Sequence, residues 1–239
     1  MGRKRKFQRF QAKMKIDGAT NDGRGVARHE DRVVFVERAV PGDLAEVYVY
    51  GKRKGTLVGK MDKLLEASPD RVDPPCQHIA LCGGCKWQSM SYEAQLSMKQ
   101  QQVEDAIHRI GKVEVGEVKP ILGSAEIFHY RNKLEFTFSN NLWLTKADKE
   151  SGVEVDKRVL GYHIPGFFDK VFAVENCLLQ KPLVNDIRNA VFQFCKEQSF
   201  SFHDIKTHEG FLRNLVFRST DHYDQMMVIL VVNEQDQEK

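Results

Sequence analysis

The sequence lacks any apolar run long enough to cross a membrane, which requires about 20 consecutive residues. Its basic N-terminus, MGRKRKFQRFQAKMK, also lacks the apolar core of a secretory signal. We therefore expect a cytoplasmic protein. Cysteine is scarce, with 5 in 239 residues, yet three of the five lie close together. In the reducing cytosol, such a cluster more often binds metal than forms disulfides.

Acidic residues are under-represented at the start of the chain. Residues 1–60 hold 15 Lys and Arg against 7 Asp and Glu, a net charge of +8. The remainder holds 21 against 26, a net charge of −5. A basic segment on a mildly acidic body indicates a polyanionic partner. The residues Arg3 to Lys6 alone could equally be a solvated tail.

Short strands dominate the first 66 residues. Five segments of strand character are separated by turn residues at Asp17-Gly18, at 21–23 and at 41–43. This pattern predicts a small closed barrel of the OB type, a common nucleic-acid platform, although such a barrel also occurs without RNA binding. Alternating apolar residues could fill its interior: Val33, Phe35, Ala45, Val47 and Val49.

A linker with three prolines, SPDRVDPPC, follows the barrel and excludes a continued helix or strand. We expect one domain over residues 1–66 and a second, an α+β body of mostly antiparallel strands, over 67–239. Strands are predicted within 130–139, 158–164, 170–177, 211–220 and 224–233. A helix with Pro182 in its first turn interrupts them, and four apolar residues share one of its faces: Leu183, Ile187, Val191 and Phe194.

A second helix is predicted near Tyr92–Ile110, with Gly111 as its C-cap. One face is polar. The other carries an apolar stripe that needs a partner covering one side only: Leu96, Val103, Ile107 and Ile110.

The clustered cysteines, Cys76, Cys82 and Cys85, have the spacing C-x5-C-x2-C. Gly83 and Gly84 allow backbone N–H groups to turn toward a ligand that carries negative sulfurs. A fourth thiolate must come from elsewhere. Cys177 ends a predicted strand at an exposed-looking junction, whereas Cys195 lies beside Phe194 in an amphipathic helix and is expected in the core.

Three kinds of site compete for these cysteines. A four-cysteine zinc site usually shows two C-x2-C pairs, and the sequence has one. An iron–sulfur cluster tolerates a three-plus-one arrangement better. A reactive thiol pair fits least well, and the spacing differs from the C-x3-C-x2-C of radical enzymes that use S-adenosylmethionine. Spacing alone leaves the cluster and zinc equally supported.

The sequence resembles the RNA uracil-5-methyltransferases through features that occur in the same order: a TRAM-like barrel, C-x5-CGGC, HYRNKLEFTFS, Cys177 and GFLRNLVFR. The branch that makes 5-methyluridine in 23S ribosomal RNA is the nearest match. The resemblance covers nearly the whole chain, and CGGC and YRNKLEF are its most specific parts. It implies a 4Fe–4S cluster, with a structural or RNA-folding role, on four ligands: Cys76, Cys82, Cys85 and Cys177.

In that family a cysteine attacks carbon 6 of a flipped-out uracil, and carbon 5 then takes a methyl group from S-adenosylmethionine. The cofactor fold and the nucleophile lie in a C-terminal α/β domain. This sequence has no strand followed by a glycine-rich turn and a helix, and the apolar helical setting of Cys195 is wrong for a nucleophile. We therefore expect the RNA-recognition part of such an enzyme, inactive alone, whose helix at 91–111 packs on the missing methyltransferase domain.

The partner implied by the resemblance is 23S ribosomal RNA, bound by a monomer without a membrane. Trp87 and Phe138 could stack on bases, although Phe138 fits the core better. His78 and His129 are expected to be ordinary polar residues. Six basic residues are candidates for RNA contact, each of which could equally be a solvated charge: Arg24, Lys52, Arg53, Lys54, Arg131 and Lys133.

Two other functions stay open at this point. The chain could be a non-enzymatic RNA-binding module with a structural zinc, which metal analysis would reveal. It could also be an interaction fragment whose acidic body binds a protein. Loss of RNA affinity on removal of residues 1–60 would count against that last function.

Overall fold

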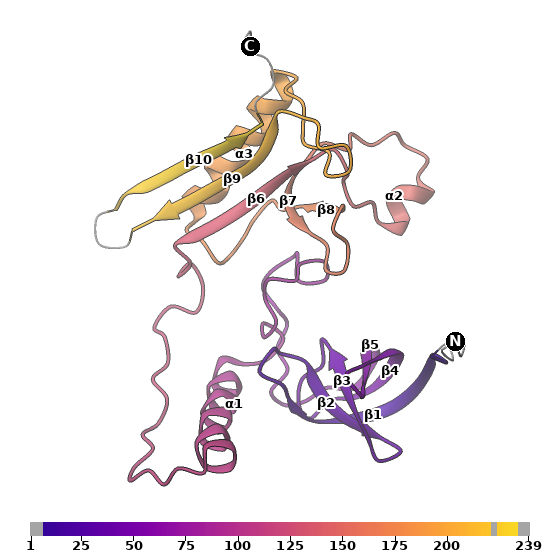
Figure 1. The fold of residues 1–239 in the computed structure, drawn as a ribbon, viewed down its shortest axis with the longest axis vertical. Helices are drawn as coiled ribbons and strands as arrows, with labels where there is room; N and C mark the ends of the chain where they lie inside the picture. Colours follow the sequence, from indigo (N-terminus) through magenta and orange to yellow (C-terminus); the bar gives the residue numbers. More distant parts are fainter. Residues whose placement is uncertain (1–6, 221–223, 234–239) are drawn as a thin grey trace, which may run out of the picture. The chain divides into compact units, whose positions relative to one another are not determined.

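The computed structural model describes residues 7–220 and 224–233 and divides the chain into two compact units (Figure 1). The first lies within residues 1–75 and 85–124, and the second within 76–84 and 125–239. The last barrel strand ends at Glu66, and residues 67–75 and 85–124 group with the barrel. The basic residues Arg3 to Lys6 lie outside the described part. No helix in that part combines the length and apolar character needed to cross a bilayer.

Five strands of the first unit form a closed barrel in the order β1-β2-β3-β5-β4. Strands β3 and β5 pair in parallel, and the other pairs are antiparallel. This arrangement confirms the expected barrel. Its strands are β1 (Phe10–Ala19), β2 (Gly25–His29), β3 (Arg32–Glu37), β4 (Leu44–Arg53) and β5 (Thr56–Glu66).

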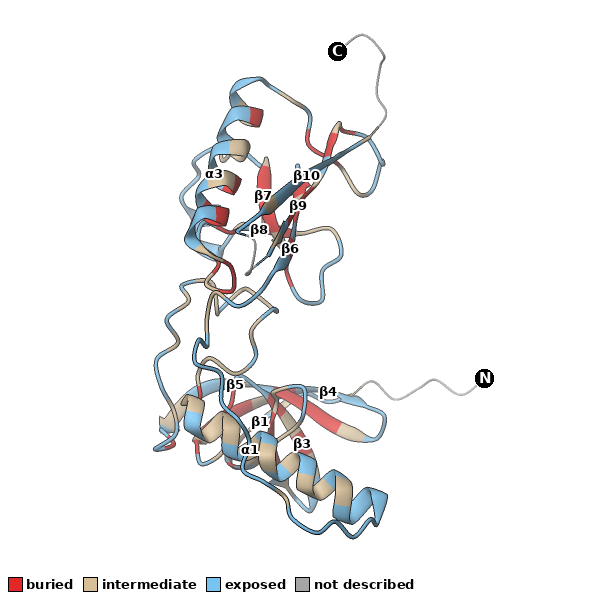
Figure 2. Cartoon of the chain, turned by 90° about the vertical axis from the view of Figure 1, so that its left-hand side faces the viewer, coloured by how far each residue is buried: buried red, intermediate tan, exposed pale blue. Residues whose placement is uncertain are grey.

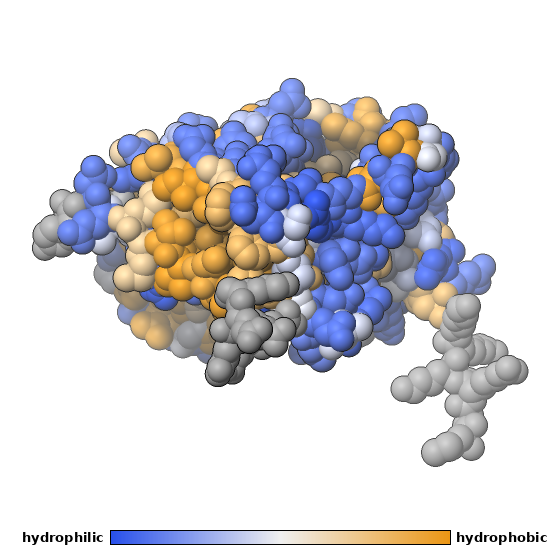
Figure 3. Space-filling model, turned by 90° about the horizontal axis from the view of Figure 1, so that it is seen from above, coloured by the Kyte–Doolittle hydropathy of each residue, from blue (hydrophilic) through white to orange (hydrophobic). Residues whose placement is uncertain are grey.

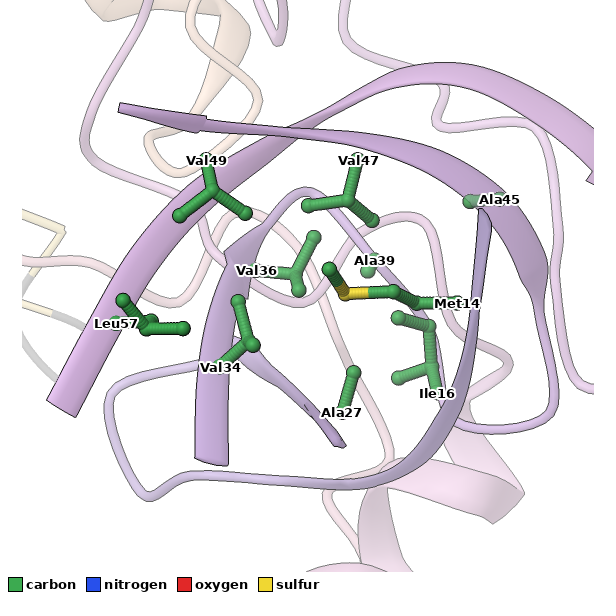
Figure 4. Close-up of a cluster of buried hydrophobic side chains, with 10 residues drawn as sticks. All are labelled: Met14, Ile16, Ala27, Val34, Val36, Ala39, Ala45, Val47, Val49 and Leu57. Atoms are coloured by element: carbon green, nitrogen blue, oxygen red, sulfur yellow. The ribbon is translucent and has the colours of Figure 1, made fainter. Parts of the chain in front are cut away.

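The barrel interior is filled by small and medium apolar side chains that point toward one another (Figure 4). Ala45, Val47 and Val49 are fully buried there, as predicted. In β3, however, the buried residues are Val34 and Val36, so the prediction for Val33 and Phe35 was wrong. The run VVFV is apolar on both faces of the strand, so its alternation does not reveal which face is inside.

The predicted turn at Asp17-Gly18 was also wrong. Strand β1 continues to Ala19, and its pairing with β2 shifts register between Ile16 and Gly18. A glycine inside a strand commonly marks such a bulge, which adds local twist. The chain reverses instead at residues 21–23, where Gly23 has a φ of +79°.

The proline-rich linker is irregular, as predicted, and a buried carboxylate fixes its start to the barrel. Asp43 is fully buried and accepts hydrogen bonds from the backbone N–H groups of Val40 (2.7 Å) and Ser68 (3.0 Å). Its carboxylate also pairs with Arg71, whose Nη2 lies 2.6 Å from Oδ2. Burial by itself would raise the pKa of Asp43, but these hydrogen bonds outweigh burial and hold that pKa below its usual value.

Helix α1 (Tyr92–Asp105) continues as a π-helical segment, η1 (Ala106–Gly111). The residue with left-handed geometry is Lys112, with a φ of 52°, so Gly111 is not the cap that we expected. No residue of either helical segment is buried, and Val103 and Ile110 of the apolar stripe are 54% and 81% exposed. Part of the stripe is therefore uncovered in the described structure.

The second unit is built on a five-stranded antiparallel sheet of order β10-β9-β6-β7-β8. Leu134, Phe136 and Phe138 of β6 are buried, which confirms the predicted alternation. A five-residue helix, α2 (Lys146–Glu150), was not anticipated. The remaining elements are β6 (Lys133–Ser139), β7 (Val159–His163), β8 (Val171–Ala173), α3 (Pro182–Glu197), β9 (Leu212–Ser219) and β10 (Met226–Val232).

Helix α3 lies along the sheet and buries a different face from the one expected (Figure 2). Leu183 and Phe194 of the predicted apolar stripe are 57% and 56% exposed. The buried residues of the helix are Val184, Asn185, Arg188 and Cys195. The sequence pattern failed because two of these side chains are polar, and polar residues usually face solvent. Their burial requires partners, which are described below.

Strand β10 reads MMVILVV and is exposed on both faces. All seven of its residues are at least partly accessible, with Val228, Leu230 and Val232 on one face 43%, 44% and 41% exposed. Its side chains contribute to the broad hydrophobic area at the left of Figure 3. Among the described strands, β10 pairs with β9 alone.

Candidate functional site

The loop 76–84 carries two of the clustered cysteines and is held by its own backbone. The N–H of Cys82 donates to the carbonyl of His78 (2.8 Å), and the N–H of Ile79 donates to that of Cys76 (3.2 Å). The N–H of Gly84 donates to the sulfur of Cys82 at 3.3 Å. A backbone N–H that points at sulfur stabilises the thiolate form.

The same loop packs on the turn between β7 and β8. A side chain at Gly83 would lie 2.7 Å from Cγ of Pro165, so this position requires glycine. The His78 ring packs on Phe172 with centroids 5.9 Å apart, and its Nε2 accepts the backbone N–H of Glu175 at 3.2 Å. Burial lowers the pKa of His78, which favours the neutral ring that this contact needs. His78 thus attaches the loop to the segment that leads to Cys177.

Cys177 is buried, 9% exposed, and does not lie at the exposed junction that its sequence position indicated. Helix α3 covers it. The side-chain amide of Asn185 accepts the Cys177 N–H through Oδ1 (2.9 Å) and donates through Nδ2 to the Cys177 carbonyl (3.3 Å). Both backbone polar groups of Cys177 are therefore satisfied by one buried side chain, which fixes the position of the cysteine.

Tyr162 of β7 connects the two parts of the site. Its hydroxyl donates to the sulfur of Cys177 at 4.0 Å, and its ring stacks on Phe136 with centroids 4.9 Å apart. Burial raises the pKa of Tyr162 far above its usual value, and the negative charge that Cys177 and Cys82 carry as thiolates adds to that rise. Cys82 and Cys177, 95 positions apart in the sequence, thus act on one phenol.

Arg188 lies beside these residues, one helical turn beyond Asn185, and is only 2% exposed. Its guanidinium is 5.4 Å from the centroid of the Phe136 ring, and Nη2 donates to Oδ1 of Asn189. Nε has no hydrogen-bond partner in the described part of the chain. Burial lowers the pKa of Arg188 to about 10, while Tyr162, Cys177 and Glu175 oppose the shift.

Sequence reasoning missed Tyr162, Asn185 and Arg188 as members of this site. The only available signal was the spacing of Asn185 and Arg188, three residues apart and therefore on the same side of α3.

All five cysteines lie among the described residues, and none forms a disulfide. Cys76, Cys82 and Cys177 belong to the second unit, while Cys85, the residue after Gly84, belongs to the first. Across residues 7–220 and 224–233, no group of three or more His, Cys, Asp or Glu side chains is arranged to hold a metal ion. Cys195 is 3% exposed, in the core as predicted, and burial raises the pKa of its thiol.

The basic residues Lys52, Arg53 and Lys54 form the tip of the β4–β5 hairpin and are exposed. Arg53 pairs with Thr56 across a two-residue turn, in which Lys54 and Gly55 have φ values of 46° and 90°. A tight turn with two positive φ angles holds the strands close. The three cations are consequently brought together on one small, ordered projection.

Two of the other three basic candidates have acidic partners. Arg24 pairs with Asp22 (2.7 Å), and its guanidinium lies 4.8 Å from the centroid of the Phe35 ring. Lys133 lies 3.8 Å from a carboxylate oxygen of Glu135. Arg131 is exposed and close enough to Tyr162 to oppose the rise in the pKa of that phenol. It is the candidate that lies next to the cysteine site.

The aromatic and histidine candidates occupy different environments in the structure. Phe138 is fully buried and packs edge-on against Phe202 at 5.1 Å, so it belongs to the core. Trp87 is half-buried, with Nε1 next to Gly23 in the first unit. His129 uses Nδ1 in a 2.6 Å contact with the carbonyl of Gln180.

An OB-type barrel followed by an antiparallel sheet with a cysteine loop thus defines the chain's architecture. No family model matches it. The chain is 44% identical over 218 residues to an uncharacterized RNA methyltransferase of Bacteroides thetaiotaomicron, covering 91% of this chain and 48% of that protein. The corresponding protein of Porphyromonas gingivalis is 41% identical, with 91% and 48% covered. The chain spans about half the length of the curated relatives it matches.

A solved structure agrees with this similarity. The tRNA (uracil-54, C5)-methyltransferase of Pyrococcus abyssi, in complex with S-adenosyl-L-homocysteine, superposes with a TM-score of 0.61 at 26% identity. The match covers 93% of this chain and 46% of that structure. The chain is therefore similar, in sequence and in fold, to about half of an RNA methyltransferase.

Proposed function

We propose that this chain is the RNA-recognition part of an S-adenosylmethionine-dependent RNA (uracil-5-)-methyltransferase that acts, as a monomer, on 23S ribosomal RNA. The observation that carries the proposal is the succession of an OB-type barrel and a cysteine-bearing sheet domain, matched over nine-tenths of the chain by proteins named RNA methyltransferases. In this proposal S-adenosylmethionine binds in the part of those relatives that this chain does not match, and methyl transfer needs that part.

RNA capture is assigned to the basic residues, with the β4–β5 hairpin as the main contact. Lys52, Arg53 and Lys54 are exposed on an ordered tip, which suits binding to phosphate groups. Arg131 and Lys133 extend the contact on the second unit, and Arg24 contributes less because Asp22 already pairs with it. The experiment is RNA binding by the whole chain, measured by fluorescence anisotropy at several salt concentrations. Affinity independent of salt would contradict the proposal.

The cysteines are assigned to a 4Fe–4S cluster with Cys76, Cys82, Cys85 and Cys177 as ligands. Three features support a bound anionic centre in the second unit: the Gly84 N–H directed at Cys82, the Tyr162 hydroxyl directed at Cys177, and the buried cation Arg188. Cys85 is included because it follows Cys82 at the C-x2-C spacing of metal ligands. The cluster would join the loop 76–84 to the segment after β8, a structural role.

Metal analysis tests this assignment against the second candidate, a non-enzymatic RNA-binding module with four-cysteine zinc. Protein purified without oxygen should be brown and contain about four irons and four sulfides per chain. Stoichiometric zinc without iron would favour the second candidate, because the same four thiolates can hold either metal. Formation of 5-methyluridine by this chain alone, given S-adenosylmethionine and ribosomal RNA, would contradict the assignment of chemistry to the unmatched part.

A further inference from the structure

A buried positive charge without an acidic partner is the least explained feature of the second unit. Arg188 is 2% exposed, and within the described part of the chain no carboxylate oxygen forms an ion pair with it. Its Nε has no hydrogen-bond partner there. An ion taken out of water without a counter-charge is strongly unfavourable, and native proteins pair such groups. Within the described residues, no carboxylate therefore balances the charge of Arg188 through an ion pair.

The position of Arg188 indicates where that partner binds. Phe136 contacts the guanidinium on one side and stacks with Tyr162, whose hydroxyl reaches Cys177. Asn185, on the same face of α3, holds the backbone of Cys177. These contacts link Arg188 to Cys177 from both the sheet and the helix.

The carboxylate of Glu175, whose charge acts on Arg188, does not fill this role. Glu175 is exposed, and its charge acts on Arg188 only at a distance, without an ion pair. Its backbone is occupied by other contacts, since the N–H donates to His78 and the carbonyl accepts Asn189. An exposed carboxylate keeps its own hydration and compensates a buried cation only weakly.

We propose that Arg188 is the internal counter-cation of the thiolate-bound centre that Cys82 and Cys177 share. This inference rests on the proposed function, because it requires a metal centre on these cysteines. Both a 4Fe–4S cluster in its resting state and a zinc ion carry a double negative charge when four thiolates bind them. A buried guanidinium stabilises either centre, and for the cluster it also favours the reduced, more negative state.

The test compares Arg188→Met, which keeps most of the aliphatic stem without the charge, with Arg188→Lys, which keeps the charge. Arg158→Met is the matched control, because Arg158 is a partly exposed arginine of the same unit that already pairs with Asp156. Each protein, as the whole 239-residue chain, is reconstituted without oxygen with ferric and ferrous iron and sulfide. Iron content, the rate of iron release to a chelator and the midpoint potential of the cluster are then measured.

We expect Arg188→Met to release iron about tenfold faster than the wild type, as loss of an outer-shell partner does in other metal sites. Its midpoint potential should become more negative. Arg188→Lys should stay close to the wild type, and Arg158→Met should be unchanged. Equal release rates and potentials for Arg188→Met and the wild type would overturn the inference.

Thermal unfolding of the metal-free and metal-loaded proteins gives a second readout. Arg188→Met should change the melting temperature of these two forms in opposite directions. Without metal, Arg188 is an uncompensated buried charge, so Arg188→Met should raise the melting temperature of the apoprotein and lower that of the loaded protein. A purely structural arginine, acting through Phe136 and Asn189, would stabilise both states equally. Destabilisation of both forms by Arg188→Met would therefore contradict the proposal.

The outcomes also separate this inference from the proposed function. If the wild type binds zinc instead of iron, the cluster assignment fails, and the release rate of zinc still tests Arg188. If the wild type binds neither metal, both proposals fail. If it binds iron and Arg188→Met behaves like the wild type, the cluster stands and the role of Arg188 is refuted.

Discussion

The hydroxyl oxygen of Tyr162 lies 4.0 Å from the sulfur of Cys177, and the phenol also responds to Cys82. The high pKa of Tyr162 keeps its proton in place at physiological pH, so the hydroxyl acts only as a hydrogen-bond donor to sulfur. Tyr162, a residue of the sheet, is therefore influenced by two cysteines that are far apart in the sequence.

Tyr162→Phe should remove this donor and keep the stacking on Phe136. We expect a decrease of about 1 kcal/mol in unfolding free energy, the usual value of one hydrogen bond. In protein loaded with a cluster, the midpoint potential should become more negative, because sulfur no longer accepts this hydrogen bond. Denaturant unfolding and redox titration measure both effects. Tyr50→Phe is the control, since the Tyr50 hydroxyl donates to Glu37 on the barrel surface. An equal shift in potential for that variant would refute the argument.

Cys177→Ser and Cys195→Ser should behave differently although both cysteines are buried. A centre that joins Cys76 to Cys177 closes a loop of about 100 residues, which by analogy with a disulfide stabilises the fold by about 4–5 kcal/mol. Cys177→Ser should therefore lose iron and make the second unit sensitive to protease, while the barrel resists. Cys195→Ser should keep its iron. Loss of iron from Cys195→Ser with retention in Cys177→Ser would show that the fourth ligand is misassigned.

Asp43→Asn should destabilise the barrel by about 3 kcal/mol, because it leaves Arg71 without its charged partner in a largely buried place. The pKa of Asp43 is lowered in the folded state, so its contribution is complete above the unfolded-state value of about 4 and is lost as the pH falls through the folded-state value. Denaturant unfolding of the barrel at several pH values measures this. The variant should lose part of the acid dependence, whereas Asp62→Asn, which alters an exposed contact with Gln11, should keep all of it.

Removing the positive charges at the tip of the β4–β5 hairpin should weaken RNA binding and reduce the dependence of that binding on salt. We expect Lys52→Gln, Arg53→Gln and Lys54→Asn to lower the slope of log affinity against log salt by about 0.7–0.9 for each RNA phosphate that the protein no longer neutralises. Asn is chosen at Lys54 because it tolerates the positive φ of that turn. Arg24→Gln should have a smaller effect, since Asp22 already pairs with Arg24. Lys146→Gln, an exposed change on α2, is the neutral control, and an unchanged slope in the triple variant would remove the hairpin from the RNA interface.

The strands of both units were predictable because turn residues and alternation mark them locally. The barrel residues Ala45, Val47 and Val49, and the buried face of β6, follow directly from that alternation. Val33 and Phe35 were wrongly assigned to the barrel interior, because a strand that is apolar on both faces does not reveal which face is buried. A bulge at Gly18 preserved the strand where the sequence indicated a turn.

The candidate site was predictable only in its cysteines. Asn185 and Arg188 are polar residues on the buried face of α3, and their burial depends on Cys177 and Phe136, which come from other elements. The sequence around Tyr162 gave no sign of its role, since alternation in a strand does not reveal that the hydroxyl contacts Cys177. These assignments depend on tertiary contacts, which no local pattern encodes.

Strand β10 has a consequence for handling the protein. Seven uncharged, proline-free residues of high strand propensity, with no described strand along the outer edge, match the composition of segments that associate edge to edge. At high concentration the isolated chain should therefore form β-rich assemblies through β10. A lysine in place of Ile229 would suppress that association, because charge on an edge strand blocks pairing between copies.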